Sequence, residues 1–221
     1  MTAPAVSIEA NFKAWITALD AHGVAATALT RPGATQIEIA RFEAHVGARL
    51  PDEVCALYAL SNGQIDPFKF GSVPSGKVIT PLFGGYEFLP LEAAAMRWTS
   101  WKEIIDQSTP EELDDFDRHA EVGDGEPVRK HYAFLAWIPF ANDGAGNDLV
   151  IDLDPAPGGT RGQVIVTGRD EPRRVLAPSM TVFLLQLTRM LEAGALTIPP
   201  RKDDDKAIVF FDIEGRDRNL Q

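Results

Sequence analysis

Apolar side chains recur along much of the chain at every third or fourth position, the spacing that places them on one face of an α-helix. Some helix ends carry clear signals. Thr35 is followed three residues later by Glu38, which is the capping-box spacing, and the pattern they open ends at Gly47. Pro110, which follows a threonine and precedes two acidic residues, marks another helix start. Together the patterns predict helices over residues 8–22, 35–47, 52–61, 91–107, 110–121 and 180–193.

The second half of the chain changes to the pattern of β-strands. Short apolar runs separated by turn residues are typical of an antiparallel meander, and they predict strands over residues 132–140, 148–153, 163–167 and 174–176, with a further strand near 86–89. Helices followed by strands and a closing helix indicate an α+β fold, in which an antiparallel sheet packs against several helices in a single domain.

Three parts of the chain can be distinguished by pattern and composition. We expect an N-terminal helix and connector over residues 1–34, the main domain over residues 35–198 and a charged tail over residues 199–221. Within the tail, residues 208–211 are apolar, and we expect them either to add an edge strand or to dock elsewhere on the domain.

The negative charge is concentrated in one segment. The net charge is −11, and residues 103–126 hold ten acidic side chains and one basic side chain, which gives −9. Such a field argues against a nucleic acid as direct ligand and favours a basic protein partner. The alternative is a solvated helix face without a partner. The candidate partner contacts are Glu111, Glu112, Asp114, Asp115 and Asp117.

Two tryptophans precede the acidic segment on one predicted helix face. Trp98 and Trp101 are three residues apart, and packing in the core is the simpler interpretation. Because tryptophan is enriched at binding hot spots, an exposed aromatic anchor beside the acidic segment is the alternative. Both tryptophans are therefore retained as candidate partner contacts.

The stretch from residue 138 to 154 holds the candidate chemistry. Asn142, Asp143, Asn147 and Asp148 place four oxygen-bearing side chains within seven residues. They could ligate a metal, form an acid–base pair or shape a turn. The calcium-loop spacing is poorly matched, since the sixth position from Asp143 is Asp148 where such loops have glycine. The intervening glycines suit a hairpin turn, and carboxylates here, with Asp152, leave a hydrolase as an alternative.

Other patterns favour no catalytic site. The four histidines lack metal-ligand spacing, and neither a phosphate-binding glycine loop nor a nucleophile-elbow serine is present, so we expect no metal, cofactor or catalytic residue. The longest apolar runs are too short to span a membrane. A single cysteine, together with an N-terminal stretch unlike a signal peptide, predicts a cytoplasmic protein, which we expect to be a monomer.

Two blocks of residues, taken in order, resemble the SUKH superfamily, the Smi/Knr-type domain, over about residues 35–193. The first block is Phe42-Glu43…Val46-Gly47…Leu50-Pro51…Leu57…Leu60-Ser61-Asn62-Gly63, and the second is Trp137-Ile138-Pro139…Asp143-Gly144…Asn147…Leu149-Val150-Ile151-Asp152…Gly162-Gln163-Val164-Ile165. The resemblance implies that the recurring family positions serve as scaffold: Glu43, Gly47, Pro51, Asn62, Gly63, Trp137, Asp143, Gly144, Asn147 and Asp152.

The resemblance also implies a function without catalysis. Members of the superfamily are protein-binding modules, and many bacterial ones resemble immunity proteins that neutralise polymorphic or contact-dependent toxins, often nucleases. Others resemble the yeast regulator of cell-wall synthesis. We therefore expect an immunity protein that binds a basic toxin domain. A regulatory interaction protein similar to the cell-wall regulator is the first alternative, and the turn-carboxylate hydrolase is the second.

Overall fold

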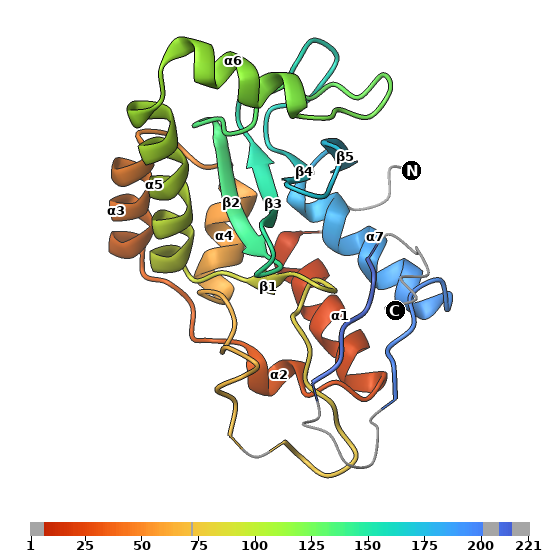
Figure 1. Ribbon diagram of the computed structural model, residues 1–221. Helices are drawn as coiled ribbons and strands as arrows, with labels where there is room; N and C mark the ends of the chain where they lie inside the picture. Colours follow the sequence, from red (N-terminus) through yellow and green to blue (C-terminus); the bar gives the residue numbers. More distant parts are fainter. Residues whose placement is uncertain (1–6, 72, 201–207, 214–221) are drawn as a thin grey trace, which may run out of the picture.

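The computed structural model, which describes residues 7–71, 73–200 and 208–213, confirms the α+β fold (Figure 1). The helices are α1 (Ile8–Ala21), α2 (Ala26–Leu29), α3 (Gln36–Val46), α4 (Asp52–Leu60), α5 (Leu91–Gln107), α6 (Pro110–His119) and α7 (Met180–Glu192). The strands are β1 (Glu87–Phe88), β2 (Trp137–Asn142), β3 (Asn147–Asp152), β4 (Gln163–Gly168) and β5 (Arg174–Ala177).

The five strands form one antiparallel sheet in the order of the sequence. Both faces of the sheet are buried, so successive residues of β3 enter different clusters. Leu149 and Ile151 join the main core, whereas Val150 lies in a smaller cluster on the opposite face with Trp137 and Ile165. This double burial explains why the strands read as continuous apolar runs.

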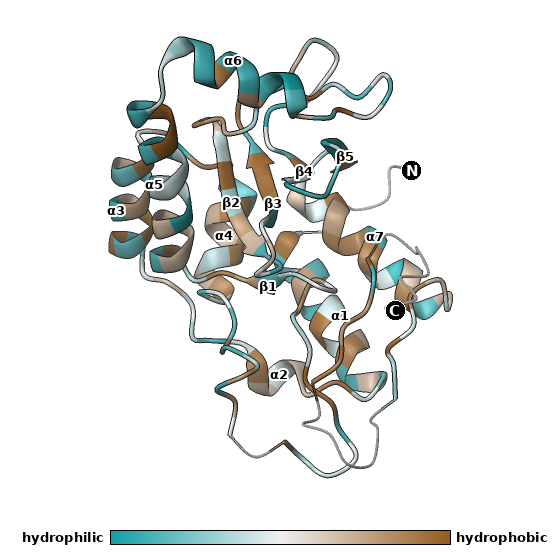
Figure 2. Ribbon diagram, in the orientation of Figure 1, coloured by the Kyte–Doolittle hydropathy of each residue, from teal (hydrophilic) through white to brown (hydrophobic). Residues whose placement is uncertain are grey.

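Two groups of helices pack around this sheet, and both contribute to the main core. In the first group α1 packs along α7, which contacts β4 and β5, and α4 contacts both helices. In the second group α5 packs against β2 and against α3 (Figure 1). The N-terminal helix therefore shares the main core, where Trp15 and Leu19 are fully buried. Figure 2 shows that α6, which crosses the end of the sheet, is hydrophilic along most of its length.

Local signals predicted most helix boundaries well, and the differences have tertiary causes. Helix α6 ends at His119 rather than near residue 121, because Ala120 turns into an extended conformation and is buried. Strand β2 begins at Trp137 rather than at residue 132. The residues before it bend across the face of the sheet that carries the smaller cluster, here called the outer face. There Tyr132 donates its backbone N–H to Asp117 (2.7 Å).

Helix α2 lies in the connector and was not expected from the pattern. It is four residues long, and its first N–H groups are capped by a side chain from the preceding helix: Asp20 Oδ1 accepts from Ala26 N at 2.9 Å. The capping residue stands six positions upstream, outside the spacing that identifies a capping box. Such a short helix gives no periodic signal of its own.

Candidate functional site

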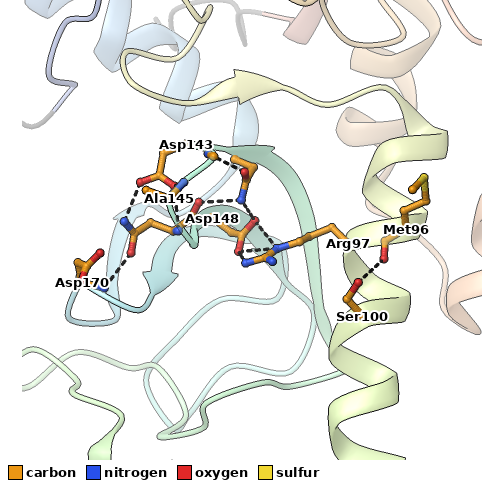
Figure 3. Close-up of polar contacts among 10 residues, drawn as sticks. Met96, Arg97, Ser100, Asp143, Ala145, Asp148 and Asp170 are labelled. Carbon is orange, nitrogen blue, oxygen red and sulfur yellow. Dashed lines mark hydrogen bonds and ion pairs between the residues drawn. The ribbon is translucent and has the colours of Figure 1, made fainter.

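The turn between β2 and β3 is built by its own polar side chains (Figure 3). Asp143 Oδ1 accepts hydrogen bonds from the backbone N–H groups of Ala145 (2.8 Å) and Asn147 (2.9 Å), and its Oδ2 accepts from Asn147 Nδ2 (2.7 Å). Gly144 and Gly146 between them adopt positive φ angles of 74° and 108°, which glycine tolerates without strain. Both oxygens of the Asp143 carboxylate therefore accept hydrogen bonds that close the turn.

Asn147 connects this turn to the neighbouring β4–β5 loop. Its Oδ1 accepts from the backbone N–H of Asp170 at 2.9 Å (Figure 3), and the side chain is buried. Glycine is required opposite it, because a Cβ on Gly168 would lie 2.4 Å from Asn147 Oδ1. Asn147 thus holds two loops together.

Asp148, which is buried, forms an ion pair with the partly exposed Arg97 of α5. Arg97 Nε lies 3.1 Å from Asp148 Oδ1 and 3.0 Å from Oδ2, and Arg97 Nη2 lies 2.6 Å from Oδ2. Asn142 Nδ2 also donates to Asp148 Oδ1, at 2.7 Å. Burial raises the pKa of Asp148, and the guanidinium and the Asn142 amide offset only part of that effect. The guanidinium carbon lies 5.6 Å from the centre of the Trp101 ring, within cation–π range.

The third carboxylate, Asp152, is also committed to structure. It is fully buried at the end of β3, and it accepts hydrogen bonds from Gln163 Nε2 (2.9 Å) and from the backbone N–H of Asp154 (3.1 Å). Burial raises its pKa.

The hydrolase alternative required Asp143 and Asp148 to face an open cleft. Both are instead engaged by donors of the fold, which removes the observation on which that alternative rested. Within the described part of the chain, no group of three or more His, Cys, Asp or Glu side chains is arranged to hold a metal ion.

The other scaffold positions lie where the chain changes direction. Glu43 is buried and accepts from Leu50 N (2.9 Å), which closes the loop between α3 and α4, and Gly47 ends α3 with φ 67°. Pro51 stands immediately before α4. Asn62 Oδ1 accepts from the first N–H of α5, that of Leu91, at 2.9 Å. Beside it, Gly63 has no room for a side chain, since a Cβ would lie 2.3 Å from Pro90 N.

The two tryptophans retained as candidate partner contacts are buried, so the alternative of an exposed anchor is wrong for them and the simpler interpretation, packing in the core, holds. Trp98 is 5% exposed and donates to Leu135 O (3.0 Å), and Trp101 is 6% exposed in the cluster on the outer face of the sheet. Each packs where α5 meets β2, as the core interpretation requires.

The acidic candidates on α6 fall into two groups. Asp117 holds the helix to the following loop by accepting from His131 Nδ1 and Tyr132 N, both at 2.7 Å. Glu112 completes the capping box with Thr109. Glu111, Asp114 and Asp115 are exposed, and Asp115 pairs with Arg118 of the same helix at 3.2 Å. Sequence reasoning grouped these five acids, but the structure separates two that position α6 from three that face solvent.

An aromatic pair beside these acids was missed. The rings of Phe116 and Tyr132 lie 5.3 Å apart, and the two residues are 36% and 44% exposed. No residue of α6 is fully buried, and the two rings lie where the loop that contains Tyr132 is held to the helix by Asp117. The pair joins residues on either side of an irregular loop, so periodicity alone gives no signal for it.

Comparison with known proteins identifies the scaffold. The model of the SMI1 / KNR4 family (SUKH-1) matches residues 33–186. Similar proteins include the "Cell wall assembly regulator SMI1" of Saccharomyces cerevisiae, which is 26% identical over 207 residues covering 80% of this chain and 40% of the yeast protein. The "Cell wall biosynthesis/cell cycle regulator smi1" of Schizosaccharomyces pombe is 29% identical, with 80% and 34% covered.

A third relative is the "Glucan synthesis regulatory protein" of Neurospora crassa, 25% identical over 190 residues, with 73% of this chain and 34% of that protein covered. The chain thus corresponds to between 34% and 40% of the length of these curated relatives. No helix in the described residues is long and apolar enough to cross a membrane. The family model covers the helices α3–α6, the whole sheet and the start of α7, and the chain belongs to the SMI1 / KNR4 family (SUKH-1).

Proposed function

We propose that this chain is a non-catalytic protein-binding module that regulates cell-wall synthesis through a partner protein. The observation that carries this proposal is the alignment of 80% of the chain with two proteins named as cell-wall regulators. These names support the regulatory function more than toxin immunity. The sequence patterns alone had made regulation the first alternative and immunity the expectation.

The polar contacts of the hairpin support a role in binding rather than in catalysis. The carboxylates considered as catalytic groups accept hydrogen bonds from other residues of the domain, and Asp148 and Asp152 are buried. A general base needs a carboxylate within reach of a substrate proton. We therefore propose no reaction for this chain and keep its cytoplasmic location and monomeric state as predictions.

We further propose that the partner binds the acidic surface of α6, defined as Glu111, Asp114 and Asp115 with the rings of Phe116 and Tyr132. Exposed carboxylates would attract a basic partner from a distance, and the two rings supply the apolar contact that charge alone lacks. Glu112 and Asp117 contribute by positioning the helix.

Toxin immunity is the second candidate function, and one feature favours it. The segment 103–126 carries −9 of the net −11, and a nuclease toxin presents basic residues near its phosphate-binding cleft. Both candidates thus predict a basic partner, and they differ in what the cell loses when the protein is absent.

Deletion of the gene in its source organism distinguishes the two functions. The regulatory proposal predicts an altered content of wall polysaccharide and greater sensitivity to wall-perturbing agents, both restored by the intact gene. An unchanged wall, with loss of protection against a toxin encoded beside the gene, would contradict this proposal and favour immunity. Deletion of an unrelated neighbouring gene is the control.

A further inference from the structure

Residues 208–213 lie against the domain as an added extended segment. Ile208 forms a parallel bridge with Ile79, and Val209 donates its backbone N–H to Ile79 O at 2.9 Å. Val78 in turn pairs in parallel with Val24. The segment is therefore the outermost member of a small ribbon of three extended pieces. Addition of a strand to an exposed edge is a common mode of peptide recognition.

Two side chains of this segment enter the apolar core. Phe211 is 5% exposed and its ring centre lies 6.2 Å from that of Trp15, which is fixed by donating to Leu82 O at 3.1 Å. Ile213 is 6% exposed, whereas Phe210 between the bridge and these residues is 46% exposed. The segment thus offers apolar side chains to the domain at its first, fourth and sixth positions.

The domain provides a groove shaped for a backbone at this place. Gly84 adopts φ +71°, and a Cβ there would lie 2.6 Å from both Phe211 O and Ile213 Cγ2. A glycine where another backbone approaches closely is typical of a site that accepts an extended chain.

Next to this groove, Ile213 also lines a cavity of about 240 Å³ between β5 and α7, with Leu176, Phe183, Leu187 and Met190 in its apolar lining. Ordering six residues costs conformational entropy that the burial of two apolar side chains does not by itself exceed. A ligand that also filled the cavity would bury more apolar surface for a similar ordering cost.

We propose that this groove is a strand-acceptor site, and that residues 208–213 are an intramolecular ligand that an extended apolar peptide of a partner protein replaces. The partner peptide would run parallel to residues 78–79, carry apolar side chains at positions equivalent to Ile208, Phe211 and Ile213, and place one more in the cavity. The inference does not rest on the acidic surface of α6, which lies at another end of the molecule (Figure 1).

The test uses a fluorescent synthetic peptide with the sequence of residues 206–213 and the full-length chain. In the Phe211→Ala/Ile213→Ala chain the internal ligand no longer competes, so the peptide should bind at least tenfold more tightly than it binds the wild-type chain. Addition of Gly84→Ala to that variant should remove this gain. Phe210→Ala is the matched control, since its side chain is exposed, and it should behave as wild type.

Circular dichroism verifies that each variant is folded; if the double variant unfolds, Ile213→Ala alone is measured against the same criterion. A folded variant that binds the peptide no better than wild type would overturn the proposal. Sedimentation of the wild-type chain and the double variant gives a second criterion. If the wild-type chain is a dimer and the double variant is a monomer, the proposal is overturned, because the groove would then receive a second copy of this chain.

Discussion

At the scale of the residue, the hairpin carboxylates Asp143 and Asp148 differ in how far away in sequence their donors lie. Asp143 is satisfied within its own turn, and that much follows from the local sequence, because aspartate and glycine at these spacings form turns. Asp148 is different: its partner Arg97 stands 51 residues upstream on α5. No periodicity or motif connects the two, so sequence reasoning left Asp148 open as a catalytic group.

Replacement of Arg97 by methionine tests the ion pair with Asp148. Asp148 would keep its burial and lose its counter-charge, so the free energy of unfolding at pH 7 should fall by about 3 kcal/mol. Burial already raises the pKa of Asp148 above 3.8. Between 3.8 and that raised value the native state holds a proton that the unfolded chain has released, so stability falls as pH rises through this window.

Without the guanidinium this window extends to higher pH, so the deficit of Arg97→Met should shrink on acidification toward pH 4. Urea unfolding of both proteins between pH 4 and 8 measures the difference. The matched control is Lys102→Met, on the same helix but paired with the exposed Asp106, which should lose well under 1 kcal/mol. A pH-independent deficit would show that Arg97 stabilises the fold by packing alone.

At the scale of the element, local signals determined helices better than strands. Helix α5 was predicted with its observed bounds, the capping box of α3 is present as expected, and α6 begins at the predicted Pro110. The start of β2 was misplaced because residues 132–136 are apolar enough for a strand, yet Asp117 of α6 draws the loop away from the sheet. The burial of Trp98 and Trp101 likewise depends on how α5 meets β2, which periodicity does not specify.

The attachment of α6 gives a prediction at this scale. Asp117→Ala removes the acceptor for His131 Nδ1 and Tyr132 N, whereas Asp114→Ala, on the same helix, removes an exposed carboxylate without such contacts. Since no residue of α6 is fully buried, the first change should increase amide hydrogen exchange in α6 and residues 131–132 by at least about tenfold, with little effect on β3. Equal exchange in both variants would show that other contacts hold the helix.

At the scale of the whole molecule, the carboxylates that suggested catalysis are engaged by the fold, and the two proposed binding sites lie on other parts of the domain. The sheet and its buried polar contacts form the family scaffold, which the ordered motifs of the sequence indicated before the structure. The exposed acids of α6 and the groove filled by residues 208–213 are separate surfaces on that scaffold (Figure 1). The comparisons favour regulation of the cell wall as the process in which such surfaces act.

Complementation of a deletion strain tests the central claim, that the chain acts by binding and not by catalysis. Asp143→Asn keeps Oδ1, which accepts from Ala145 and Asn147, but replaces Oδ2, the acceptor for Asn147 Nδ2, with a donor. Because it removes the carboxylate charge and not the turn, the variant should restore the wall phenotype fully when it is expressed at the wild-type level. Glu111→Lys/Asp114→Lys should fail to restore it, whereas Glu9→Lys/Glu192→Lys, with the same net charge and exposed positions elsewhere, should succeed. Two results together would contradict the account: Asp143→Asn is expressed normally but fails to restore the wall phenotype, and Glu111→Lys/Asp114→Lys restores it fully.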